Sequence, residues 1–134
     1  TGWYILGLVE SNADGRYNER IVGLATELLR YQKAGGGFGA MYFNSDSPFE
    51  SSGSALIGLL MVRAHEIKPD ARFTDAALAI EKRLMACTRR NGALDYCQGD
   101  TKGIGYSSRT LSVMPFAQGV ALRLSKELDK YADR

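Results

Sequence analysis

Residues 50–62 read ESSGSALIGLLMV, a polar lead followed by an apolar run. The run is apolar on nearly every side, which predicts a helix that is buried all round. The polar lead places a carboxylate and three hydroxyls at the start of that helix: Glu50, Ser51, Ser52 and Ser54. Backbone N–H groups at a helix N-terminus are unpaired and the helix dipole is positive there, which suits a bound carboxylate. Ordinary capping by a serine is the alternative reading of the same residues.

Outward from this stretch, apolar and amphipathic helical patterns alternate along the chain. Five helices are predicted: 3–10, 17–32, 54–66, 73–88 and 115–131. The first and third are apolar nearly all round, whereas the second and fourth carry a single apolar stripe. Short extended pieces are expected in the long loops, one of them at 93–97, and Pro115 suits the first turn of the last helix.

The pattern repeats with an offset of 56 residues. The matching pairs are Arg16 and Arg72, Tyr17 and Phe73, Leu28 and Leu84, Gly36 and Gly92, and Phe38 and Leu94. Each unit is a buried helix, a short turn, an amphipathic helix and a long loop. Repeated helical hairpins predict an all-α toroid or stack, with the apolar helices forming an inner ring and the amphipathic helices an outer ring.

This alternation fixes the direction of the inner helices. If inner and outer helices alternate, all inner helices run the same way and begin at one face. The long loops 33–53 and 89–114 then open on that face, while the short loops 11–16 and 67–72 lie on the opposite one. Because long loops in a compact domain usually carry function, the face where the inner helices begin is the predicted working face.

Composition sets the broad limits. The chain has 134 residues, of which 45% are hydrophobic, and this suits one folded domain over 1–134. The net charge of +2 comes from 17 basic and 15 acidic residues without a basic block, which argues against nucleic acid as a partner. No run approaches the ~20 apolar residues of a membrane span. One histidine and two cysteines argue against a metal centre, and no cofactor is expected.

The beginning of the chain, TGWY, has no initiator methionine and opens directly into a helical pattern. This suggests a segment of a longer protein, so the missing signal peptide says little about the compartment. The compartment stays open, with the cytoplasm preferred to the periplasm.

Several side chains on the predicted working face could bind a sugar. Trp3 begins an inner helix, and aromatic rings stack on sugar faces, although a core tryptophan would look the same. The acids of that face are Asp46, Glu50, Asp95 and Asp100, and its loop also carries Tyr96, Gln98, Tyr106 and Arg109. A positioned carboxyl is the usual proton donor in glycoside chemistry, but loop acids are more often simply solvated. His65 falls on the opposite face, where a structural role is expected.

Four runs together resemble the C-terminal part of the unsaturated uronyl hydrolases, glycoside hydrolases typified by the unsaturated rhamnogalacturonyl and unsaturated glucuronyl hydrolases. These runs cover most of the chain in order: TGWYILGLVE at 1–10, ESSGSALIGLL at 50–60, NGALDYCQGD at 91–100 and PFAQGVALRL at 115–124. The resemblance implies an (α/α)6 toroid, of which this chain supplies about five helices.

The resemblance also implies a reaction on oligosaccharides that a lyase has left with a C4=C5 double bond. An aspartic acid protonates C4, water adds at C5 with loss of the double bond, and the hemiketal collapses to release the terminal uronic acid residue without a cofactor. That aspartate is expected before Thr1, so the catalytic residue is not assigned within this chain and no turnover is expected of it alone. The expected substrate-wall residues are Trp3, Glu50, Ser51, Ser52, Gln98 and Tyr106.

Two other functions stay open. A non-catalytic helical-repeat scaffold would usually have short loops on both faces, whereas an epimerase on a similar toroid would usually need more histidines than His65. For any of these, an incomplete ring leaves apolar helix faces in water. The expected partners are therefore an oligosaccharide and either the remainder of the barrel or a second copy of the chain.

Overall fold

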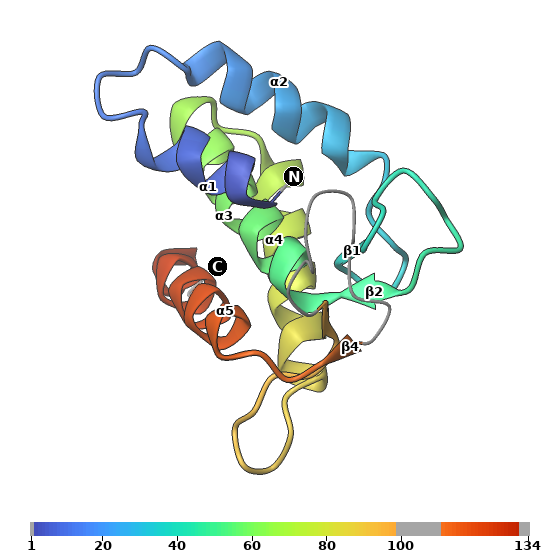
Figure 1. Ribbon diagram of the computed structural model, residues 1–134. Coiled ribbons are helices and arrows are strands. Elements are labelled where there is room, and N and C mark those ends of the chain that lie inside the picture. Colours follow the sequence, from blue (N-terminus) through green and yellow to red (C-terminus); the bar gives the residue numbers. More distant parts are fainter. Residues whose placement is uncertain (1, 99–110, 132–134) are drawn as a thin grey trace.

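The computed structural model describes residues 2–98 and 111–131, and the fold is all-α (Figure 1). Its helices are α1 (Gly2–Glu10), α2 (Asn18–Leu29), α3 (Ser51–Ile67), α4 (Ala71–Ala86) and α5 (Pro115–Leu128), with a 3-10 turn η1 at Asp129–Tyr131. Short antiparallel pairs join β1 (Phe38–Gly39) to β2 (Phe49–Glu50) and β3 (Cys97–Gln98) to β4 (Leu111–Ser112). The five predicted helices are confirmed.

Their boundaries differ from the predictions at the caps. α3 begins at Ser51 rather than at residue 54, because the side chain of Glu50 caps it. α4 begins at Ala71 rather than at residue 73, because the Asp70 side chain accepts a hydrogen bond from the Arg72 N–H. α2 ends three residues early and the last helix closes in the 3-10 turn. The short strand expected at 93–97 is observed at Cys97–Gln98 instead.

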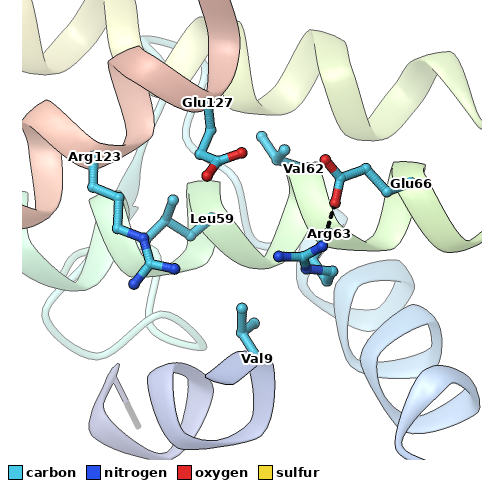
Figure 2. A pocket seen from close by; sticks show the side chains of 7 residues that line it. All are labelled: Val9, Leu59, Val62, Arg63, Glu66, Arg123 and Glu127. Atoms are coloured by element: carbon cyan, nitrogen blue, oxygen red, sulfur yellow. Dashed lines mark hydrogen bonds and ion pairs between the residues drawn. The ribbon is translucent and has the colours of Figure 1, made fainter. Parts of the chain in front are cut away.

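The helices α1, α3 and α5 run parallel and begin at the same end of the molecule. At that end Gly2 of α1 lies against Leu56 of α3, and the rings of Trp3 and Phe116 lie 6.1 Å apart. At the other end Glu10 of α1 pairs with Arg123 of α5. Figure 2 shows the end of α1 beside the last turns of α3, and in Figure 1 the labelled strands lie where α3 and α5 begin. The predicted direction of the inner helices is confirmed.

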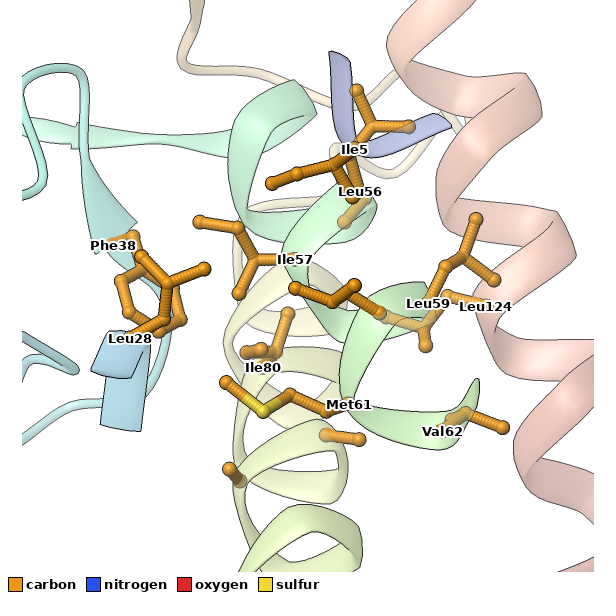
Figure 3. Packing of buried hydrophobic residues seen from close by; sticks show 14 of the residues in the cluster. Ile5, Leu28, Phe38, Leu56, Ile57, Leu59, Met61, Val62, Ile80 and Leu124 are labelled. Atoms are coloured by element: carbon orange, nitrogen blue, oxygen red, sulfur yellow. The ribbon is translucent and has the colours of Figure 1, made fainter. Parts of the chain in front are cut away.

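α3 is the central helix and packs against all four others. Its sequence is apolar on every side, and from Ser54 to Met61 every side chain is buried. Figure 3 shows Ile57 facing Leu28 and Phe38, while Leu59 faces Leu124 of α5. Gly58 allows the close approach of α5, because a Cβ there would come within 2.5 Å of Leu124. Each large apolar side chain buried in this way contributes about 1.5–3 kcal/mol.

The 56-residue repeat extends to individual hydrogen bonds. Gly36 and Gly92 both have positive φ, +79° and +83°. The N–H of each donates to the carbonyl three residues earlier, at 2.8 Å in both units. The Cβ of an alanine at Gly36 would also lie 2.2 Å from the backbone oxygen of Ala79, so two separate constraints require glycine there. The two hairpins are therefore copies of one structural unit.

α1 departs from the prediction that it is buried all round. Ile5, Leu8 and Val9 are buried against α3, but Trp3 is 71% and Tyr4 49% exposed. The difference follows from position, because α3 packs against all four other helices, whereas α1 lies at one edge of the helix assembly and packs mainly against α3. In residues 2–98 and 111–131, no helix is both long and apolar enough to cross a bilayer.

Candidate functional site

The candidate site is the end of the molecule where α1, α3 and α5 begin. Its best-defined part is the carboxylate of Glu50, which is 6% exposed and accepts four hydrogen bonds. One oxygen receives the N–H of Ser52 at 3.0 Å, the Ser52 hydroxyl at 2.7 Å and the Gln98 N–H at 3.1 Å. The other receives the Gly53 N–H at 2.6 Å.

These contacts give Glu50 a structural task. It supplies the cap of α3 that sequence analysis considered for a serine, and it joins that cap to β3. Ser54 joins the same turn to β1, since its hydroxyl donates to the Glu50 carbonyl at 2.6 Å and accepts from the Phe38 N–H at 2.8 Å. Glu50 and Ser52 are thus brought to the expected place, but both are buried and occupied by each other. Both side chains are therefore used to hold the first turn of α3 in place.

Ser51 lies deeper in the same turn. Its N–H donates to the Tyr96 carbonyl at 3.0 Å, and its hydroxyl oxygen is buried without a hydrogen-bond partner in the described part of the chain. Tyr96 adopts a φ of 61°, in the left-handed region that non-glycine residues rarely enter. This backbone conformation accompanies the Tyr96–Ser51 bond, while the Tyr96 ring packs edge-on against Phe49 at 6.3 Å.

Trp3 is the most exposed of the described aromatic residues at this end, where Tyr96 is also partly exposed. The Trp3 ring is tilted 36° to that of Phe116, which begins α5. Sequence analysis did not single out Phe116, although its place directly after the helix-starting Pro115 was a signal. Gln98 lies on β3, half-buried, with its N–H on Glu50. The predicted site residue Tyr106 lies outside the described residues, as do Asp100 and Arg109.

Two other described acids were predicted on this face, and one of them is ion-paired. Asp95 accepts from the Arg89 guanidinium at 2.6 and 2.9 Å, and these bonds lower the pKa of its carboxyl. A lowered pKa keeps the group ionised, which is the opposite of what a general acid needs. Asp46 lies exposed in a turn, where its N–H donates to the Asn44 side chain.

The opposite end of the inner helices is tightly packed between α1, α3 and α5, where a cavity of about 10 Å³ has room for a single water (Figure 2). Beside it lies a hollow of about 260 Å³, lined by Val9, Glu10, Asn12, Ala13, Arg63 and Arg123. His65 lies at this end, with Nδ1 3.1 Å from the Asp70 N–H and its ring 5.5 Å from that of Tyr131. The structural role expected for His65 agrees with these contacts. Among the described residues, no group of three or more His, Cys, Asp or Glu side chains could hold a metal ion.

Comparison with known proteins gives one informative result. No family model and no curated protein matches the chain. Among solved structures, it is similar to a protein of Salmonella enterica subsp. enterica serovar Paratyphi A str. ATCC 9150, described as a possible member of the GH105 family. The TM-score is 0.76 over 91% of this chain, at 22% sequence identity. The two chains share a fold. This chain covers 34% of the length of that protein.

Proposed function

We propose that this chain is part of a glycoside hydrolase that removes a terminal unsaturated uronic acid from lyase-generated oligosaccharides of the pectin or glycosaminoglycan type. The observation that carries the proposal is the exposed Trp3, held at the end where three parallel helices and both long loops meet. A shared fold with a possible GH105 member adds support, because that family name agrees with the resemblance found in the sequence.

In the proposed reaction this segment supplies the pocket wall. The indole of Trp3 stacks on the sugar ring, and Phe116 limits the tilt of the indole. Glu50 holds the first turn of α3 against β3, so that the wall keeps its shape without the substrate. Protonation of C4 is assigned to an aspartate outside this segment, as the resemblance implies. The contacts of Glu50 with four donors and of Asp95 with Arg89 agree with this assignment.

The loop lengths favour this proposal over a helical-repeat scaffold. Between α1 and α2, and between α3 and α4, the chain needs only short turns, whereas 30–50 and 87–114 are long connections at the end with Trp3. A scaffold has no need for this asymmetry. An epimerase with a histidine acid and base is disfavoured, because His65 is bound to the turn at the far end.

A ligand-binding experiment tests the proposal, and Trp3 makes it simple because it is the only tryptophan. Titration with an unsaturated uronyl disaccharide should change the Trp3 emission in a saturable way. The saturated disaccharide of the same sugars should bind more weakly. Phe116→Ala keeps the fluorophore but releases its ring contact, so it should weaken binding, while Met85→Ala, at a 69% exposed position on α4, should not.

Turnover provides the second test. The isolated chain should bind the unsaturated disaccharide but leave the absorbance of its double bond unchanged over hours. Loss of that absorbance with the pure chain would show that the proton donor lies within these 134 residues. If no uronyl sugar changes the fluorescence emission of Trp3, the proposed function itself is contradicted.

A further inference from the structure

A second groove lies away from Trp3, between the end of α2 and the loop that joins β1 to β2. Residues 30–34 and 42–45 line it, and its volume is about 440 Å³. This falls within the roughly 300–1,000 Å³ that is typical of small-molecule sites. The loop is held in place by Lys33, whose Nζ donates to the Ser45 carbonyl at 2.8 Å, and by a bond of 2.9 Å from the Met41 N–H to the Ser47 hydroxyl.

Three aromatic rings form the apolar part of this groove. The rings of Tyr31 and Tyr42 meet edge to face at 5.5 Å, and those of Tyr42 and Phe43 meet at 5.5 Å with an angle of 87°. Phe43 is 65% exposed, so its ring is accessible to a ligand. Two rings at a right angle offer one face for stacking and one edge beside it, a corner that fits a pyranose ring.

The lining of the groove is cationic, but Arg30 is paired at 2.5 Å with Glu27 of its own helix, so a bound anion competes with that carboxylate. Two lining residues, Arg30 and Lys33, are cationic, and none of the lining residues is acidic. The Asn44 side-chain oxygen accepts from the Asp46 N–H at 2.9 Å, which leaves its amide N–H groups as the donors on that side chain. A ligand that matches this surface has an apolar ring face, hydroxyl groups and a negative charge.

We infer that the groove between α2 and the 40–48 loop is a second binding site for acidic oligosaccharides, in which Phe43 stacks on a sugar ring and Arg30 and Lys33 face a uronate carboxylate. The preference for an anion with a stackable ring follows from the groove alone. The choice of a uronate rests on the proposed function. Such a site would hold the uncut part of a pectin-like chain, outside the pocket that binds its unsaturated end.

Affinity electrophoresis of the whole chain tests this inference at low protein concentration. Native gels contain polygalacturonate or, as a neutral control, dextran. Polygalacturonate should retard the wild-type chain and dextran should not. Phe43→Ala should raise the apparent dissociation constant about tenfold, the cost of one lost ring contact, and Arg30→Gln should raise it severalfold. Phe43→Tyr and Arg30→Lys should restore binding.

Matched controls separate this site from charge effects and from the Trp3 site. Arg16→Gln removes an equally exposed arginine with the same 2.5 Å ion-pair geometry as Arg30, so it should not change the retardation. Trp3→Ala should also have no effect, because saturated polygalacturonate lacks the unsaturated end. Equal retardation of Phe43→Ala and wild type, or of Arg30→Gln and Arg16→Gln, would overturn the inference. Retardation that only Trp3→Ala relieves would overturn it too, because it would place the polygalacturonate at Trp3 and not at Phe43.

Discussion

Replacing Glu50 is the sharpest perturbation of the candidate site. In Glu50→Gln one acceptor oxygen becomes an NH₂ group that faces backbone donors, so at least one buried N–H loses its partner. Such a group costs about 1–3 kcal/mol. Glu50→Ala removes all four bonds, including the cap of α3 and the link to Gln98. A lost cap costs about 0.5–2 kcal/mol and the lost bond from the Gln98 N–H about 1–3 kcal/mol, so the total is about 1.5–5 kcal/mol.

Urea unfolding followed by helical circular dichroism measures this cost. With a total stability of about 5–15 kcal/mol for a domain, Glu50→Ala should lose a large fraction of it, and the unfolding midpoint should fall markedly. Asp70→Ala is the matched control, since the side chain of Asp70 also caps a helix but is only partly buried and bonds to Arg72 in its own turn. If the two alanine variants have the same midpoint, Glu50 does not hold the site together as described.

Three further predictions concern stability, thiol chemistry and association. The hydrogen bond from Arg72 lowers the pKa of Asp70 from its ordinary 3.8 to about 2, so the ionised Asp70 stabilises the fold above pH 3.8 and this stabilisation is lost as the pH falls towards 2. Asp70→Asn should therefore flatten the pH dependence of the free energy of unfolding between pH 2 and 3.8. An unchanged slope would refute a role of the Asp70–Arg72 bond in stability. Burial raises the pKa of the Cys87 thiol, and Cys97 is completely buried, so both should react with a thiol reagent far more slowly in the native state than in urea. The exposed apolar side chains of α1 and α5 should make the chain associate at high concentration, as measured by light scattering, and Leu122→Glu should reduce this association. A monodisperse wild-type monomer at high concentration would contradict the prediction.

The helices and their direction could be predicted because their signals are local. The all-round apolar pattern of α3 and the repeated glycines at 36 and 92 depend only on helical periodicity and on backbone φ. The start of α3 could not be predicted as well, since glutamate is not among the preferred caps and its partner Gln98 lies 48 residues away in the sequence.

The candidate site also has one part that the sequence predicted and one part that it did not. Trp3 could be predicted as a site residue because an inner helix begins there. Its exposure follows from the place of α1 at one edge of the helix assembly. The groove at Phe43 was missed, because Tyr31 falls in the predicted helix 17–32 and Tyr42 in the predicted long loop 33–53. Only the fold of the 40–48 loop over the end of α2 brings these rings together.

The proposed sugar site rests on the parallel direction of α1, α3 and α5. Nuclear Overhauser effects from the single indole test this direction. Protons of Trp3 should show cross-peaks to the ring of Phe116, and the α-protons of Gly2 to the methyl groups of Leu56. Cross-peaks from the indole to His65 or Leu128, at the far ends of α3 and α5, would contradict the arrangement and remove the basis for a sugar site at this end.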